Sequence, residues 1–311
     1  MFFGSGAFGV PTLEALARDH EVALVVSQPD RPAGRGKALT PTPLAARAAE
    51  LGLEVIKPED VNASEVREAI RARSAHAWVV IAFGQKLSRE LLDGVFAINL
   101  HGSLLPAYRG AAPIQRAVMD GCAETGVTVI SLAERMDAGL VYAERRRAIG
   151  ETETSEDVHD ALSLLGPEAV SDVLARHASG TLVGQPQDET KATRARKLAK
   201  HDGTVDFRAV DAEAARALVN GLNPWPGCTV VVGSVALKLC RLGRADAAGL
   251  GEESVGRLQA DGRIRARSGA LRVLEVQPVG GRRMAFDEFM RGRPALAGCL
   301  VEPASAPPAG G

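Results

Sequence analysis

The strongest constraint on the fold is an alternation, along the first half of the chain, between short apolar runs and longer amphipathic stretches. This pattern is typical of βαβ units, in which helices cover both faces of a parallel sheet. It predicts helices at residues 12–19, 43–51, 64–73 and 113–120, and strands at 21–27, 77–82, 96–101 and 127–131. We therefore expect an α/β domain with a doubly wound, mostly parallel sheet.

The pattern changes beyond residue 200. Short β-prone runs separated by glycine occur at 228–232, 235–241, 263–266 and 271–277. Runs of this kind predict a small antiparallel β-barrel of OB-like type. The predicted organisation is a first domain at 1–180, a polar linker at 181–200, the barrel domain at 201–303 and a disordered tail at 304–311.

Composition excludes several classes of protein. The chain has no run of 18 apolar residues, and its start has no basic segment leading into an apolar one, so we expect a soluble, cytoplasmic protein without membrane contact. The four cysteines are widely spaced and form no Cys-x-x-Cys pair, which argues for buried thiols rather than a metal site or a disulfide framework. They are Cys122, Cys228, Cys240 and Cys299.

Charge is distributed unevenly along the chain. From Lys191 to the end there are 19 basic and 12 acidic residues, whereas residues 1–190 hold 18 basic and 26 acidic ones. A basic C-terminal third attached to an acidic body indicates a polyanionic partner.

The first βα connection, residues 4–9, reads Gly-Ser-Gly-Ala-Phe-Gly and fits the dinucleotide-binding fingerprint. The acidic residue expected at the end of the second strand is absent, because Ser27 and Gln28 stand there. Two alternatives stay open: backbone N–H groups at a helix N-terminus that approach some other ligand, and a tight turn without a ligand.

Residues 98–106, Ile-Asn-Leu-His-Gly-Ser-Leu-Leu-Pro, are the most informative stretch. In a strand, Asn99 and His101 fall on one face at the C-terminal end, where open α/β sheets bind ligands. A carboxamide beside an imidazole suits the stabilisation of an oxyanion. Asp137, followed by Ala138 and Gly139, is the best of many candidates for the carboxylate that would orient the imidazole.

The loop 28–41 is long for a βα connection and carries Arg31, Arg35 and Lys37 among glycines and prolines. Such a cationic loop suits contacts to phosphate, although a solvated surface loop is the alternative. In the second domain, Arg282 and Arg283 lie on a Gly-rich loop and are further candidates for phosphate contacts. Trp225, between two prolines, is expected to anchor the barrel as a buried aromatic rather than to stack on a nucleobase.

Together these stretches resemble the methionyl-tRNA formyltransferase family from Met1 to about Leu300. Residues 99–106 and 109–115 look like the folate-dependent formyltransferase core, and residues 28–37 look like the family's tRNA-contacting insertion. Residues 223–227 and 276–278 look like its C-terminal barrel.

The resemblance implies a formyltransferase-like Rossmann variant and a transfer of formyl from 10-formyltetrahydrofolate to the α-amino group of initiator methionyl-tRNA. It implies that Asn99, His101 and Asp137 form the catalytic triad, without a metal. It also implies a monomer and two sets of contacts, with tRNA at Arg31, Arg35, Lys37, Arg282 and Arg283, and with the folate at Ser103, Leu104, Leu105, Pro106, Phe83 and Gly84.

Three alternatives remain. Another 10-formyltetrahydrofolate-dependent enzyme could act on a small amine such as glycinamide ribonucleotide or an amino sugar nucleotide, because the same triad would serve any amine. An NAD-dependent dehydrogenase could be built on residues 4–9. The loop around Asp137 departs from the commonest form of the family, so a tRNA-binding module without activity is the third alternative.

Overall fold

The computed structural model describes residues 1–33, 36 and 38–304. The chain forms two compact units that do not follow a single cut in the sequence. The first unit comprises Met1–Gly110, Gly126–Arg147 and His159–Arg194, and the second comprises Ala111–Thr125, Ala148–Val158 and the chain from Ala195 onward. The predicted linker at 181–200 stays a prediction, and the predicted tail lies, from residue 305, outside the described residues.

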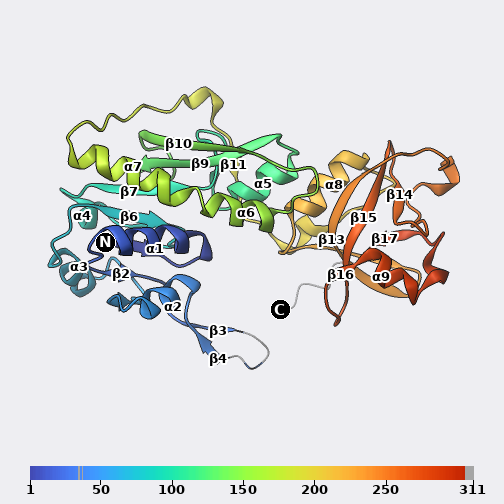
Figure 1. The fold of residues 1–311 in the computed structure, drawn as a ribbon, viewed down its shortest axis with the longest axis horizontal. Coiled ribbons are helices and arrows are strands. Elements are labelled where there is room, and N and C mark those ends of the chain that lie inside the picture. Colours follow the sequence, from blue (N-terminus) through green and yellow to red (C-terminus); the bar gives the residue numbers. More distant parts are fainter. Residues whose placement is uncertain (34–35, 37, 305–311) are drawn as a thin grey trace. The chain divides into compact units, whose positions relative to one another are not determined.

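The first unit is built on a seven-stranded sheet with the order β10-β9-β7-β6-β1-β2-β5 (Figure 1). Strands β7, β6, β1, β2 and β5 are parallel neighbours, and β9 runs antiparallel to β7. The predicted mostly parallel sheet is confirmed. Its strands are β1 (Phe2–Gly4), β2 (Val25–Val26), β5 (Val55–Ile56), β6 (Trp78–Ile81), β7 (Ala97–His101), β9 (Glu124–Ser131) and β10 (Val141–Ala148).

Helices cover both faces of this sheet. Ile70 of α3 and Leu91 of α4 join Phe3, Val26 and Val80 of the sheet in one buried cluster. On the opposite face, α1 packs against α2 and α7. The helices are α1 (Val10–Asp19), α2 (Pro43–Glu50), α3 (Ser64–Arg71), α4 (Arg89–Leu92), α6 (Ser155–Ser163) and α7 (Gly166–Ala178).

The order of the strands places a topological switch between β1 and β6, because the chain moves from β1 outward in both directions. Open α/β sheets bind ligands beyond the carboxyl ends of the strands at such a point. Two of the three fingerprint glycines beside it, Gly4 and Gly9, have packing roles. A Cβ on Gly4 would lie 2.8 Å from the Ile81 carbonyl oxygen, and one on Gly9 would lie 2.9 Å from Leu44. These glycines are explained without a dinucleotide.

The long loop after β2, predicted at residues 28–41, contains regular structure. Arg31–Ala33 and Ala38–Thr40 form the antiparallel strands β3 and β4 of a short hairpin. The chain returns to the sheet unit through Thr42, whose hydroxyl caps α2 by accepting the Ala45 N–H at 3.1 Å.

The second unit contains an antiparallel sheet with the order β14-β15-β13-β12-β17, and β16 pairs with β15. This half-barrel confirms the predicted antiparallel β domain. Its buried core also includes helices α8 and α9, which the sequence analysis did not predict. The elements are α5 (Pro113–Met119), α8 (Ala212–Gly221), β12 (Cys228–Val232), β13 (Val235–Ala245), β14 (Arg263–Arg265), β15 (Ala270–Pro278), β16 (Met284–Ala285), α9 (Phe286–Arg291) and β17 (Val301–Pro303).

The expectation that Trp225 is a buried anchor is wrong, because its side chain is 52% exposed. Cys228 and Cys240 are buried as expected, whereas Cys122 and Cys299 are only partly buried. Across the residues that the structure describes, no helix is both long and apolar enough to cross a bilayer.

Candidate active site

Strand β7 carries the two residues that the sequence singled out most strongly. Asn99 and His101 lie two positions apart at its C-terminal end, so their side chains leave the same face of the sheet. Leu100 between them is buried on the opposite face, close to Gly166 of α7. Because β7 is paired with β6 on one side and with β9 on the other, the backbone of both polar residues is fixed by the sheet.

His101 is 6% exposed and has an oxygen acceptor on each side of its ring. Nε2 lies 2.9 Å from the carbonyl oxygen of Tyr108. Nδ1 lies 3.7 Å from Oδ1 of Asp137, an ion-pair distance that is longer than a hydrogen bond. A ring nitrogen must carry a proton to bond a carbonyl, so the Nε2 contact requires the proton to be on Nε2.

Asp137 is held by a hydrogen bond to its carboxylate and has an unusual backbone conformation. Its side chain is 12% exposed, and Oδ2 accepts the N–H of Gly110 at 2.8 Å. Its φ is 55°, in the left-handed region that a residue other than glycine rarely occupies. The structure thus brings the predicted carboxylate to the predicted imidazole across 36 residues of sequence.

Asn99 differs from its neighbours because its side chain is half-buried yet makes no hydrogen bond with any described residue. Its amide N–H groups and its amide oxygen are therefore not engaged by the described part of the chain. They lie on the same face of β7 as the His101 imidazole, so both side chains can present polar groups to one bound molecule.

The predicted folate-contacting segment after β7 is a loop held by side-chain hydrogen bonds. Ser103 is fully buried, and its hydroxyl donates to the Ala107 carbonyl at 2.7 Å, so its side chain is already engaged. Leu105 is buried as well, whereas Leu104 and Pro106 are partly exposed. The surface that this loop presents to a ligand therefore comes from Leu104 and Pro106 rather than from Ser103.

The loop after β6 is similar. The ring of Phe83 is buried against Phe3, with ring centroids 5.7 Å apart. The Phe83 carbonyl accepts hydrogen bonds from Ser5 Oγ at 3.1 Å and from Gln28 Nε2 at 3.2 Å. Gly84, at φ 86°, turns the chain beyond it. The loop can present backbone groups to a ligand, but the Phe83 side chain belongs to the core.

Backbone strain marks the same region. The positive-φ residues other than glycine in the described chain are Ala82, Tyr108 and Asp137. Ala82 follows β6, Tyr108 supplies the carbonyl that faces His101, and Asp137 faces the imidazole. Such strain clusters at functional sites. Sequence reasoning missed Ala82 and Tyr108, because neither residue type signals a left-handed backbone.

The candidate phosphate-binding residues differ in their availability. Arg31 is exposed and pairs with Glu59 at 3.2 Å, and Arg282 is exposed and pairs with Glu288 at 2.8 Å. Arg283 is less exposed and is bound by Glu275 and by Glu156, which hold its charge within the protein. Arg35 and Lys37 lie outside the described residues.

The structure adds a group of cations that the sequence analysis did not single out. Four side chains between residues 194 and 200 are exposed and have no carboxylate partner among the described residues. They contrast with most arginines of the second unit, which are paired. They are Arg194, Arg196, Lys197 and Lys200.

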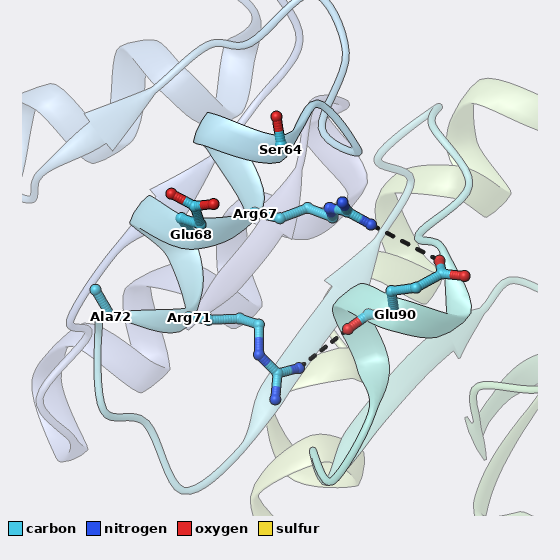
Figure 2. Close-up of a pocket in the computed structure, with 6 residues that line it drawn as sticks. All are labelled: Ser64, Arg67, Glu68, Arg71, Ala72 and Glu90. Carbon is cyan, nitrogen blue, oxygen red and sulfur yellow. Dashed lines mark hydrogen bonds and ion pairs between the residues drawn. The ribbon is translucent and has the colours of Figure 1, made fainter.

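One pocket of the first unit is separate from this site. Figure 2 shows it between α3 and α4, lined by side chains that include Arg67, Arg71 and Glu90. Arg67 lies 3.9 Å from the Glu90 carboxylate, and Arg71 donates to three carbonyl oxygens at the end of α4. The pocket contains none of the predicted site residues.

Comparison with known families identifies the class of protein to which this fold belongs. The family described as "Formyl transferase" matches residues 1–174, and "Formyl transferase, C-terminal domain" matches residues 197–294. The fold and the site thus define the class as the formyl transferases. Among curated proteins, methionyl-tRNA formyltransferase of Heliobacterium modesticaldum is 41% identical over 306 residues, covering 94% of this chain and 96% of that protein. The chain belongs to the methionyl-tRNA formyltransferase family, as its motifs indicated.

Solved structures show the same fold. HypX from Aquifex aeolicus, in complex with tetrahydrofolic acid, superposes with a TM-score of 0.61 at 17% identity, over 93% of this chain and 46% of HypX. The chain thus spans about half the length of HypX. The N-formyltransferase from Helicobacter canadensis, in complex with folinic acid and dTDP-3-aminofucose, superposes with a TM-score of 0.68 at 14% identity, over 88% of this chain and 97% of that one.

Proposed function

We propose that this chain transfers the formyl group of 10-formyltetrahydrofolate to the α-amino group of initiator methionyl-tRNA, with Asn99, His101 and Asp137 as the residues that carry the chemistry. Family membership supports the reaction. The single observation that supports the assignment of residues is the unpartnered Asn99 amide, two positions before an imidazole that is flanked by a carboxylate.

In the proposed reaction, the formyl carbon gains a bond to the methionyl nitrogen and loses its bond to N10 of the folate. The amine gives up a proton and N10 gains one. Asn99 donates its amide N–H to the formyl oxygen as negative charge develops there. His101 supports that charge and moves the proton, and Asp137 keeps the imidazole oriented.

The structure sets one condition on the role of His101. Its Nε2 already faces the Tyr108 carbonyl at 2.9 Å. To donate to the formyl oxygen, Nε2–H must share its proton with that carbonyl or leave it when the substrate binds. Asn99 has no such competing partner, so we assign it the larger share of oxyanion stabilisation.

We further propose that the folate lies against Ser103, Leu104, Leu105 and Pro106 and against the backbone at Phe83 and Gly84. Phosphates of the tRNA would contact Arg31, Arg282 and the residues 194–200, together with Arg35 and Lys37. Arg283 contributes less, because two carboxylates already bind it. The protein would act in the cytoplasm as a monomer, which sedimentation of the purified chain would test.

One experiment tests the reaction. The purified chain is incubated with 10-formyltetrahydrofolate and, in separate reactions, with methionyl-initiator-tRNA, methionyl-elongator-tRNA, glycinamide ribonucleotide and an amino sugar nucleotide. We expect formyl on the initiator methionyl-tRNA alone. Formylation of a small amine in its place would overturn the proposal. Absence of formyl transfer, with retained binding of tRNA, would favour the inactive tRNA-binding module.

A further inference from the structure

The segment 187–189 lies outside the predicted catalytic domain, yet it contacts the loop that carries Asp137. Gln187 donates from Nε2 to the carbonyl oxygen of Asp137 at 2.8 Å and to that of Gly139 at 2.9 Å. One amide nitrogen thus holds both ends of the turn that contains the left-handed Asp137. Such a turn is strained and persists only when its surroundings hold it.

Arg109 determines which way the Gln187 amide points. Its Nε and Nη2 donate to Oε1 of Gln187 at 3.0 Å and 2.6 Å. The amide oxygen is therefore occupied by a cation, and the nitrogen must face the two carbonyls. The Arg109 side chain is only 10% exposed, so its guanidinium is largely buried where it binds the Gln187 amide oxygen.

Arg109 belongs to a two-residue strand, β8 (Arg109–Gly110), that also contacts the Asp137 carboxylate. Gly110 donates its backbone N–H to Asp137 Oδ2 at 2.8 Å. Asp137 is thus fixed at two points, its carbonyl by Gln187 and its carboxylate by Gly110. Both contacts trace back to residues 109–110.

Glu189 completes the network. It accepts from Arg109 Nη2 at 2.8 Å and Nη1 at 3.1 Å, and it also pairs with Arg135, two residues before Asp137. The hydrogen bonds from Arg109, and then those from Arg135, lower the pKa of this carboxyl from 4.5 to about 2. Glu189 is therefore charged at neutral pH and holds both guanidinium groups.

We propose that Gln187 is a positioning residue for formyl transfer, which acts by holding the 137–139 turn so that the Asp137 carboxylate faces the His101 imidazole. The proposal rests on the proposed function of Asp137, and it adds a residue that has no contact with the reacting atoms. It also gives a role to a segment that the sequence suggested was only a linker.

The chemistry of the contact provides a sharp variant. Gln187→Glu keeps an oxygen for Arg109 but replaces the nitrogen that donates to the two carbonyls with a second acceptor. The matched control is Gln185→Glu, because Gln185 is exposed and its side chain makes no hydrogen bond with any described residue. Both variants add the same charge to the same segment.

We expect Gln187→Glu to lower kcat about 10- to 100-fold, since small misplacement of a catalytic group has effects of this size. The KM for methionyl-tRNA should stay within about threefold of the control. In a double-mutant cycle, adding Gln187→Glu to Asp137→Asn should change kcat little further, because both act through the same group. Additive losses would overturn the proposal in favour of a general structural role.

A second readout does not depend on activity. The amides of Gly110, Ala138 and Leu140 are bonded within this turn, to Asp137 Oδ2, the Arg135 carbonyl and Ser131 Oγ. Gln187→Glu should speed their hydrogen exchange at least about tenfold relative to Gln185→Glu. Unchanged exchange would refute the positioning role of Gln187, whether or not the wild-type chain formylates tRNA. An inactive wild-type chain in which Gln187→Glu still accelerates exchange would refute only the proposed function.

Discussion

The hydroxyl of Thr128 donates a hydrogen bond of 2.7 Å to the carbonyl oxygen of Ser103, and both residues are fully buried. The Thr128 hydroxyl oxygen in turn accepts the N–H of Leu105 at 3.1 Å. Thr128 lies directly opposite His101 in the pairing of β9 with β7. One side chain of β9 therefore shapes the loop that follows β7.

The variant Thr128→Val tests this relationship. Valine keeps the shape of threonine but leaves the Ser103 carbonyl and the Leu105 N–H unpaired in the interior, which costs about 1–3 kcal/mol. We expect a lower free energy of unfolding and a severalfold higher KM for 10-formyltetrahydrofolate, because the loop would no longer be held for the folate. The KM for methionyl-tRNA should be unchanged.

Thr229→Val is the matched control, since Thr229 lies on β12 and its side chain makes no hydrogen bond among the described residues. Steady-state kinetics and urea unfolding of both variants provide the measurements. Equal KM values for the folate in Thr128→Val and Thr229→Val would show that the hydrogen bonds of Thr128 to this loop do not contribute to folate binding.

Asn99→Ala should separate catalysis from stability more cleanly than any other change in the site. The loss of one oxyanion donor typically lowers turnover by ~10²–10³. Because the Asn99 side chain bonds no described residue, the free energy of unfolding should change by less than about 0.5 kcal/mol. His76→Ala, at an exposed histidine, is the control. Near-normal kcat in Asn99→Ala would remove the amide from the mechanism.

Strand β7, which carries the proposed catalytic residues, could largely be predicted from the sequence, because the alternation of side chains in a strand is a local property. The predicted strand 96–101 differs from β7 by one residue, and Asn99 and His101 share a face as expected. The mostly parallel sheet followed from the same local periodicity. By contrast, β2 spans only Val25–Val26 within the predicted 21–27, because short parallel pairing rather than hydrophobicity sets its ends.

The rest depended on contacts between distant parts of the chain. Gln187 contacts the Asp137 turn across 50 residues of sequence, and the residues around Gln187 give no local signal of this contact. The left-handed backbone of Tyr108 is likewise invisible, because tyrosine does not favour it. The burial of Trp225 was predicted wrongly because the sequence does not show which residues pack over an aromatic side chain.

The exposed cations at residues 194–200 are expected to contribute to tRNA binding. We expect Lys197→Gln with Lys200→Gln to weaken tRNA binding and to reduce the slope of log K against log salt by ~1.4–1.8, because two phosphate contacts are lost. The control is Arg263→Gln with Arg267→Gln, which removes equal charge from arginines already paired with Asp261 and Asp211. Binding measured at several salt concentrations distinguishes the two pairs, and equal slopes would exclude residues 197 and 200 from the interface.

The last prediction concerns acid stability of the second unit. Burial of the Asp157 carboxyl would raise its pKa, but hydrogen bonds from Arg241 and Thr154 outweigh that effect and lower the pKa from 3.8 to about 2. Arg241 Nη1 and the Thr154 N–H each lie 2.7 Å from Oδ2. Since the folded pKa is below the unfolded one, the carboxylate stabilises the fold fully above about pH 5 and progressively less as the pH falls toward 2.

A shift of this size corresponds to roughly 2 kcal/mol, which we discount to about 1 kcal/mol because the side chain is 34% exposed. Asp157→Asn should therefore lower the free energy of unfolding by about 1 kcal/mol at pH 7 and by about half as much at pH 3. Urea unfolding at both pH values measures this difference. Asp287→Asn, at an exposed carboxylate that bonds no described residue, should show neither effect. A pH-independent difference for Asp157→Asn would mean that packing, and not charge, accounts for its contribution.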